Sequence, residues 1–480
     1  MPRPALIALG LGVVVAGGLA AVNPFIGLGL AVVGLAGAIL ARTDLTRLGQ
    51  TGVILAAVTA IIGPNLALPG APSVFAFRII IVTLGLAFAV YLLMDGRVVM
   101  PRGLPRPAGF LLALIVWSVV SIFWADDTAA ALRWTLFMAM MGGLAIGIPL
   151  ACRKRANAIR LLVALGVTFT LATVLALAEL RLGIRLPTSA LAGRTGPGFA
   201  TSLFGNQNNF ATYLSLTLPY FLCLPVVFKD ARLIALGVAG GLVTLAALLF
   251  TGSRSNLLAT FLILGGLVLV LLTDRRRRGR AVGGAAIVAL ALILIVPSLG
   301  GGGLIPLPAN VVEKFDIGQF LEQRNTTGIG SAAVRSSLLT DGLGVVSDSS
   351  GLGVGAGNAE GSIRSLAAFT GIENLHNWWL EVLVNLGVVG LALYVGLFLT
   401  LLRGQLRAAR RTDDPLVRWL GLSGGLALVG FIVGSLGPSS AIHFAPMWIT
   451  FGLGMLTLVM ARDAAARRTE PHPEGHAPRP

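Results

Sequence analysis

Long uninterrupted runs of apolar residues dominate this chain of 480 residues. They recur along most of its length and span 16 to 26 residues each, close to the roughly 20 that a helix needs to cross the hydrocarbon core of a bilayer. Only 12% of the residues are charged, too few to give a soluble protein of this size a polar surface. The chain is therefore predicted to be an all-α polytopic membrane protein.

About fourteen transmembrane helices are predicted. The first run follows Arg3, and a second run comes directly after it, which favours a retained membrane helix over a cleaved signal peptide. Short connections between most runs predict that each helix packs against its neighbour in the sequence. The predicted spans lie near residues 5–21, 25–40, 52–68, 78–94, 108–124, 131–151, 161–180, 209–228, 233–250, 255–273, 281–297, 377–402, 419–436 and 443–460.

The basic residues orient these spans. If the N-terminus is cytoplasmic, 26 of the 36 lysines and arginines lie on the cytoplasmic side, including the "DRRRRGR" run at 274–280. This is the asymmetry of the positive-inside rule, so both termini are predicted to be cytoplasmic. The arginine run is interpreted as a topological anchor. The net charge of +16 is accounted for in the same way, without a nucleic-acid partner.

Two long connections, 181–208 and 298–376, then lie outside the cell membrane. The second contains the amphipathic stretches "VVEKFDIGQFLEQ" and "SAAVRSSLLTDGLG", which predict short helices in a folded external cap. It also contains "GLGVGAGN" at 351–358. No predicted strand precedes these glycines and they fit no dinucleotide or P-loop pattern, so they are interpreted as a reentrant turn or a loop packed closely on helices.

Arg254 stands out among the outer basic residues. It lies in "FTGSRSN", a turn too tight to let its side chain reach bulk water freely. A guanidinium held there suits a phosphate or diphosphate, and snorkelling toward lipid headgroups is the alternative. Arg335, in the large loop, fits either a ligand contact or a solvated position from its spacing alone.

His376 is one of only four histidines and stands at the mouth of an apolar helix. The positive end of the helix dipole disfavours the imidazolium, so the ring is expected to be neutral. It is then either a general base or a polar interfacial residue. Asn377, Glu381 and Asn385 follow at i, i+4 and i+8, and Glu381 must face a cavity or a partner because lipid cannot accommodate a carboxylate.

Two further residues are secondary candidates for the site. His443 lies at an outer helix end, where a structural role is favoured, and Arg133 lies on the outer side of the predicted span 131–151. Cys152 and Cys223 are isolated within or beside membrane helices, and no histidine or acidic spacing is typical of a metal site. A mechanism without metal or cofactor is therefore expected.

Four motifs in the C-terminal half occur in an informative order. They are "FGNQNNFATYLSLTLP" (204–219), "TGSRSNLLA" (251–259), "VRSSLLTDGLGVVSDSSGLGVGAGN" (334–358) and "LHNWWLEVLVNLGVVGLALYV" (375–395). Taken together, with the large loop between them, they resemble the O-antigen ligase and polymerase family of bacterial membrane glycosyltransferases. The N-terminal half matches only as a series of spans.

The resemblance implies a fold like that of C-type glycosyltransferases and a role for each matching position. Arg254 and Arg335 would grip the diphosphate of a polyprenyl-diphosphate-linked sugar chain. His376 would deprotonate or orient an acceptor hydroxyl, which would attack the anomeric carbon with inversion. The supporting positions would be Asn208, Glu373, Asn377 and Glu381.

The predicted function is transfer or polymerisation of lipid-linked glycans on the outer face of the bacterial cytoplasmic membrane. Its partners would be the donor, a hydroxyl-bearing glycan or lipid acceptor, membrane lipid and other polysaccharide-assembly proteins. The expected organisation is N-terminal transmembrane helices (1–160), a ligase/polymerase-like transmembrane core (161–460) that includes the external loop 298–376, and a disordered cytoplasmic tail (461–480). A polymerase and a ligase would differ only in the acceptor, and the sequence does not decide between them. The rival function is a transporter or lipid-linked oligosaccharide flippase. A purely structural scaffold is the third alternative.

Overall fold

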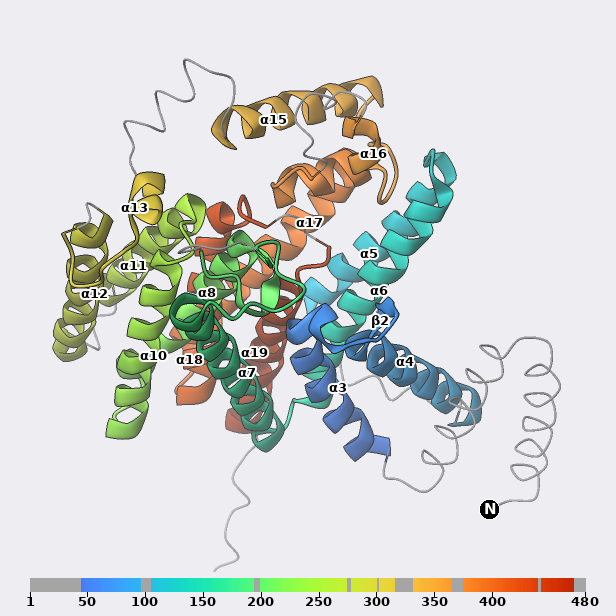
Figure 1. The fold of residues 1–480 in the computed structure, drawn as a ribbon. Helices are drawn as coiled ribbons and strands as arrows, with labels where there is room; N and C mark the ends of the chain where they lie inside the picture. The colour runs from blue at the N-terminus through green and yellow to red at the C-terminus, as the bar shows by residue number, and fades with distance from the viewer. Residues whose placement is uncertain are drawn as a thin grey trace, which may run out of the picture.

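The computed structural model describes residues 45–95, 105–193, 199–273, 278–299, 302–315, 331–364, 374–438 and 442–469. This part of the chain is almost entirely helical, with one small two-stranded antiparallel sheet (Figure 1). Ten helices within it are long and apolar enough to cross a membrane, and α4 and α12 each contain a shorter apolar stretch. The prediction of an all-α polytopic membrane protein is confirmed.

The elements of the N-terminal half alternate with short turns. They are α3 (Leu45–Ile62), η1 (Gly63–Leu66), β1 (Ala67–Leu68), β2 (Ala71–Phe75), α4 (Ala76–Asp95), α5 (Arg106–Val120), η2 (Ser121–Trp124), α6 (Thr128–Ala151) and α7 (Arg155–Leu182).

The C-terminal half adds the most buried helices and, among the described residues between α12 and α17, the helices α13, α15 and α16. Its elements are η3 (Ser202–Phe204), α8 (Gln207–Leu222), α9 (Leu224–Val227), α10 (Ala231–Leu249), α11 (Arg254–Thr273), α12 (Arg278–Leu299), α13 (Ala309–Phe315), α15 (Ser331–Asp348), α16 (Ala359–Arg364), α17 (Trp378–Arg411), α18 (Pro415–Gly434) and α19 (Ala445–Thr469).

Each predicted span from 52–68 onward coincides with a helix, whereas 5–21 and 25–40 lie outside the described residues. One boundary needs correction. The tail expected to be disordered from residue 461 is helical as far as Thr469. Its alanines and arginines favour helix, and Asp463 accepts two hydrogen bonds of 2.6 Å from Arg153, which tie this extension to the end of α6.

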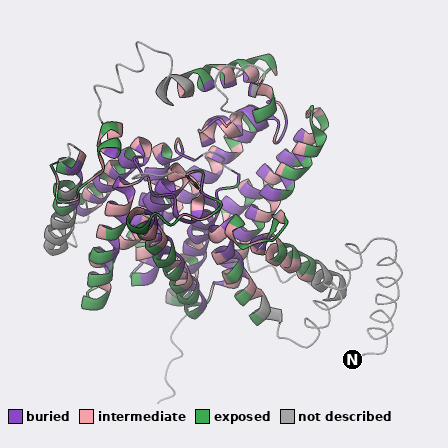
Figure 2. Ribbon diagram, in the orientation of Figure 1, coloured by how far each residue is buried: buried purple, intermediate pink, exposed green. Residues whose placement is uncertain are grey.

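The core lies around α18, which packs against α8, α11, α17 and α19. Most of α8 and α18 is buried, and the centre of the bundle is correspondingly purple in Figure 2. Peripheral helices expose apolar side chains instead. On α7, for example, Val163, Val167 and Val174 are 60%, 65% and 57% exposed. A continuous apolar surface of this kind suits lipid contact.

The large connection between α12 and α17 is folded where the structure describes it. The helices α13, α15 and α16 lie over one end of the bundle (Figure 1). The second amphipathic stretch lies in α15, and the first begins in α13 and continues outside the described residues, so helices are confirmed in the described part of the loop. This end of the bundle also contains the starts of α8, α11 and α17, and is called the cap end below.

A break in α17 attaches this cap to the bundle. Gly387 has φ 67° and ψ −167°, so the helical bond expected from Val388 N–H to the carbonyl of Val384 is not made. Both orphaned groups are satisfied by the cap: Val388 donates to the carbonyl of Gly351 (2.9 Å), and the carbonyl of Val384 accepts from Val354 (2.9 Å). The cap and the helix thus complete each other's backbone pairing.

The glycine-rich segment, residues 349–358, makes this approach sterically possible. A Cβ on Gly353 would lie 2.6 Å from the backbone nitrogen of Gly387, and one on Gly355 would lie 2.6 Å from Cβ of Ala125. Positive φ angles are adopted by Gly351, Gly353, Gly355 and Gly357. Glycine is therefore required here for both conformation and space, which confirms the prediction of a loop packed closely on helices.

Replacing Gly353 should loosen the cap. Gly353→Ala forces a methyl group against the backbone of α17 at φ 76°, and we expect a loss of about 2 kcal/mol or more. Thermal unfolding of the purified protein in detergent would measure it. Gly344→Ala in α15 is the matched control, because a Cβ there meets nothing within 4 Å. Equal melting temperatures for the two variants would contradict the steric account.

Candidate active site

Arg254 is the first residue of α11 and follows a tight turn at the cap end. In that turn Gly252 has φ 63°, and a Cβ there would lie 2.8 Å from the ring of Phe199 and 3.2 Å from the side chain of Lys314. The Nε–H of Arg254 donates to the backbone carbonyl of Lys314. The guanidinium is therefore held between the bundle and α13 of the cap, as the tightness of the turn predicted.

Arg335 lies on α15 and is half-buried. Burial lowers the pKa of its guanidinium, and the positive charge of Arg254 lowers it further. The two arginines are thus electrostatic neighbours, although 81 residues separate them in the sequence. The cap folds back far enough to bring the two proposed phosphate-binding residues together.

His376 precedes α17 and has a φ of 48°, in the left-handed region that few residues other than glycine adopt. Its Nδ1 is buried and has no hydrogen-bond partner within the described part of the chain. Burial is the main cause that lowers the pKa of the ring and Arg335 is the second, while a hydrogen bond to the carbonyl of Pro438 opposes them. The sequence predicted a neutral ring from the helix dipole, and burial and Arg335 now supply further causes.

Lys314 is a member of this group that the sequence reading missed. It lies near the end of α13, with its Nζ 3.9 Å from the centroid of the Phe199 ring. Burial is the main cause that lowers the pKa of its ammonium, and the positive charges of Arg254 and Arg335 lower it further. The available signal was its place in an amphipathic stretch of a chain with only three lysines.

The supporting positions have different surroundings. Asn377 caps α17, its side chain accepting from Leu380 N–H at 3.3 Å, and Glu381 is half-buried in the first turn. Asn208 lies in the first turn of α8, where its N–H donates to the side chain of Asn206 at 2.8 Å. Glu373 lies outside the described residues.

The two secondary candidates, His443 and Arg133, lie in other surroundings. His443 lies between α18 and α19, with its ring centroid 4.4 Å from that of Phe137. Burial, followed by the charge of Arg78, lowers its pKa to about 4. Arg133 is exposed on α6. Neither of them is among the charges that shift the pKa values of His376, Arg335 and Lys314.

A buried polar network supports the site from below, and its centre, Asn256, was not singled out from the sequence. Asn256 is fully buried and donates to Thr212 (3.0 Å) and Ser253 (3.1 Å), while its carbonyl accepts from Ser215 (3.0 Å). It also packs on Gly437, where a Cβ would lie 2.7 Å from Nδ2. The network therefore fixes both the turn that carries Arg254 and the residue before Pro438, which contacts His376.

A second buried group holds the loop before α8. The carboxylate of Glu179 in α7 accepts hydrogen bonds from Thr201 N–H (2.6 Å), Thr201 Oγ1 (2.7 Å) and Ser202 N–H (2.9 Å). These bonds compensate the desolvation of the carboxylate. They also fix the segment that begins with Phe199, the aromatic ring under Lys314.

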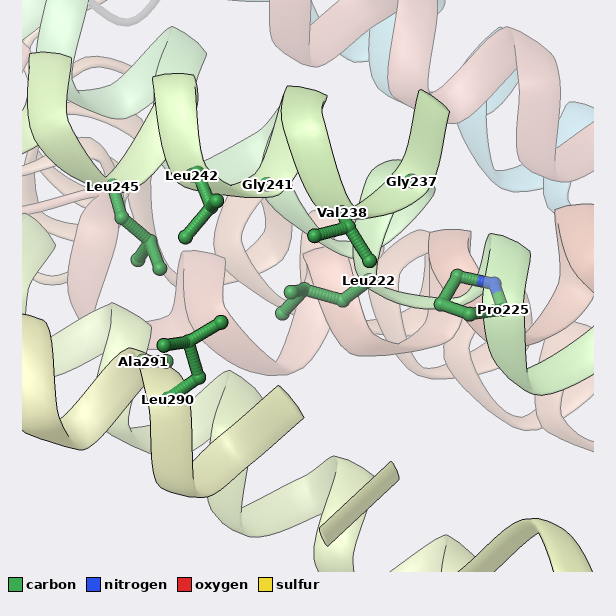
Figure 3. Close-up of a pocket in the computed structure, with 9 residues that line it drawn as sticks. All are labelled: Leu222, Pro225, Gly237, Val238, Gly241, Leu242, Leu245, Leu290 and Ala291. Atoms are coloured by element: carbon green, nitrogen blue, oxygen red, sulfur yellow. The ribbon is translucent and has the colours of Figure 1, made fainter. Parts of the chain in front are cut away.

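Two hollows lie away from these residues. The one in Figure 3, about 20 Å³, is lined by apolar residues of α8 to α10 and α12, and offers no group for chemistry. The other, about 380 Å³, is near the starts of α3 and α7, at the opposite end of the bundle. Its lining consists of Arg47, Gln50, Thr51, Ile54, Asn157 and Arg160.

The fold and the site define a polytopic membrane protein with three cations and a neutral histidine gathered at one end of its helices. Comparison with known proteins shows what the chain is similar to. A family model described as O-antigen ligase matches residues 239–395, which include Arg254, Lys314, Arg335 and His376. This match and the relative described next support the resemblance to the O-antigen ligase/polymerase-like family that the motifs predicted.

A curated relative matches over a much longer stretch. The teichuronic acid biosynthesis protein TuaE of Bacillus subtilis (strain 168) is 26% identical over 416 residues. The match covers 84% of this chain and 81% of that protein. The similarity therefore extends well beyond the segment that carries the site and into the N-terminal helices.

Removing the side-chain amide of Asn256 should destabilise the cap end. Asn256→Leu keeps the volume but leaves buried hydroxyls unpaired, at a cost of about 2–4 kcal/mol. Thr260→Val, one turn further along α11, is the matched control, since Thr260 bonds only the carbonyl of Asn256 within its own helix. Thermal unfolding would compare them, and an Asn256→Leu melting temperature no lower than that of the control would refute the supporting role.

Proposed function

We propose that this protein transfers glycans from a polyprenyl diphosphate to a hydroxyl acceptor on the outer face of the bacterial cytoplasmic membrane. The family-model match and the curated relative support a glycosyltransferase or ligase-type membrane enzyme of cell-surface polysaccharide biosynthesis. The observation that carries the finer proposal is the convergence of Arg254, Arg335 and His376 from three separate segments. Two fixed cations beside one neutral base match a donor with an anionic leaving group.

The arginines would act on the leaving group. The diphosphate of the donor gains negative charge as its bond to the sugar breaks, and guanidinium groups already in place stabilise that charge without reorganisation. Arginine is suited to this because its planar fork can form two parallel hydrogen bonds with one phosphate. The half-buried positions of Arg254 and Arg335 strengthen such contacts by lowering the local dielectric.

His376 would act on the acceptor. Its neutral ring, with Nδ1 unpartnered in the described structure, can accept the proton of an acceptor hydroxyl. The hydroxyl oxygen then forms a bond with the anomeric carbon while the bond from that carbon to the diphosphate oxygen breaks. The electron pair of the broken bond leaves with the diphosphate, and this single displacement inverts the anomeric centre.

The proposal assigns charge neutralisation to side chains and requires no metal ion. Among the described residues, no group of three or more His, Cys, Asp or Glu is placed to hold one. Three cations, Arg254, Lys314 and Arg335, instead supply positive charge around the proposed diphosphate position.

The outer-face assignment rests on charge distribution. The ion-paired Arg153 and Arg155 lie at the connection between α6 and α7, at the opposite end of these helices from the cap. The positive-inside rule favours placing that end in the cytoplasm. The site residues lie at helix ends and in the cap, whereas transporters typically place ionisable residues near the bilayer midplane. This position favours surface chemistry over transport.

Replacing His376 should abolish glycan transfer. His376→Asn is the sharper variant, because Asn tolerates the left-handed backbone of this position but cannot take up a proton at neutral pH. A strain lacking the gene would be complemented with wild type or with the variant, and its surface and lipid-linked glycans separated on a gel. Loss of the ladder to a single repeat would indicate a polymerase, and long polymer retained on lipid would indicate a ligase.

The variant must be present in the membrane at the wild-type level for this comparison. Near-normal transfer by His376→Asn would remove the proposed base. An unchanged glycan profile in the deletion strain itself would contradict the glycosyltransferase proposal. It would favour the transporter alternative instead.

Arg254→Lys should also impair transfer strongly, because an ammonium cannot reproduce the bidentate contact or the hydrogen bond from Nε. We expect a loss of about tenfold or more. Turnover of a lipid-linked donor by purified protein in nanodiscs would measure it, with Arg133→Lys on exposed α6 as the matched control. Wild-type turnover by Arg254→Lys would show that the guanidinium does not bind the diphosphate.

A further inference from the structure

Lys314 is held in place by three kinds of contact. Its carbonyl accepts from Arg254, its aliphatic stem packs beside the turn at Gly252, and its Nζ lies 3.9 Å from the centroid of the Phe199 ring. A lysine at the surface of a loop would have none of these. The structure therefore fixes the ammonium at the cap end, beside Arg254.

No acidic side chain compensates this charge in the described part of the chain. The ion pairs of Arg153, Arg155 and Arg418 lie at the opposite end of the bundle. Neither Lys314 nor Arg335 forms one. Two partly buried cations, Lys314 and Arg335, that also repel Arg254 are costly without an anion of their own, so the arrangement indicates that an anionic ligand completes it.

The cations are arranged in an order relative to His376. The ring of His376 has Arg335 as its cationic neighbour, while Lys314 is paired through its backbone with Arg254 on α11. The helix that carries Lys314, α13, contacts α12. In Figure 1 it lies above α11 and α12, and α15 and α17 are farther along the cap end. Lys314 and His376 thus mark two ends of the site.

The surroundings of the Lys314 end are apolar. Leu304, shortly before α13, is 77% exposed, and Ile293 and Val296 on α12 are 57% and 56% exposed. These side chains offer a surface to lipid rather than to water. The entirely apolar hollow of Figure 3 also lies between α10 and α12. A hydrocarbon chain is accommodated on this side more readily than a sugar.

We propose that Lys314 binds the phosphate nearest the lipid, so that the donor lies with its prenyl end at Lys314 and its sugar end at His376. Arg335 then contacts the phosphate next to the sugar. This inference rests on the proposed function and adds a direction to it. A prenyl monophosphate, which has only the lipid-proximal phosphate, should still meet Lys314 but should not reach Arg335.

The test is binding of two probes of equal chain length, a prenyl monophosphate and a prenyl diphosphate, to the purified protein in nanodiscs. Lys314→Met keeps an unbranched stem but removes the charge, and should weaken both probes about tenfold. Lys314→Arg should retain most of the affinity. Arg335→Gln should weaken the diphosphate by about the same factor and leave the monophosphate nearly unchanged.

Lys229→Met, at the opposite end of the bundle, is the matched lysine control and should bind both probes like wild type. If wild type binds neither probe, the proposed function fails. If wild type binds the diphosphate and Lys314→Met binds it equally well, only the role of Lys314 fails. If Arg335→Gln weakens the monophosphate and Lys314→Met does not, the direction of the donor is reversed and the inference is overturned.

Discussion

The backbone N–H and C=O groups of a membrane helix must be paired. Without the cap, the break in α17 at Gly387 would leave two of these groups unpaired. The glycine-rich segment supplies the missing donor and acceptor, through Val354 and Gly351. This exchange of hydrogen bonds fixes the cap to the helix that His376 precedes. Arg335 lies on α15, and this helix directly precedes the same segment. The hydrogen bonds at the break therefore also set the distance between Arg335, the proposed phosphate ligand, and His376, the proposed base.

The charges at the site follow from the position of the cap. The cap brings Lys314 and Arg335 to Arg254, and none of the described ion pairs neutralises Lys314 or Arg335. Partial burial makes their mutual repulsion larger than it would be in water. The same burial keeps His376 neutral. An anion that bound here would relieve the repulsion, and this is the physical reason for proposing a diphosphate as the ligand.

The sequence predicted the helices well because long apolar runs leave a bilayer protein few alternatives. It also singled out Arg254 and His376, since a charge in a tight outer turn and an imidazole at a helix mouth are unusual enough to notice. Arg335 could be placed only through the family resemblance. Lys314 gave only one signal in the sequence, its place in an amphipathic stretch, because its role depends on a contact with Arg254 that spans 60 residues. Asn256 was missed for a related reason: a single amide in an apolar helix shows its importance only when its three hydroxyl partners are seen around it.

The central claim is that Arg254 and Arg335 bind one diphosphate while His376 faces the sugar. The most direct test is an experimental structure of the protein in a nanodisc with an unreactive prenyl-diphosphate-linked sugar bound. Our account predicts phosphate oxygens within hydrogen-bond distance of both guanidinium groups, and the anomeric carbon on the His376 side. A diphosphate bound elsewhere, with Arg254 and Arg335 making no contact to it, would contradict the account.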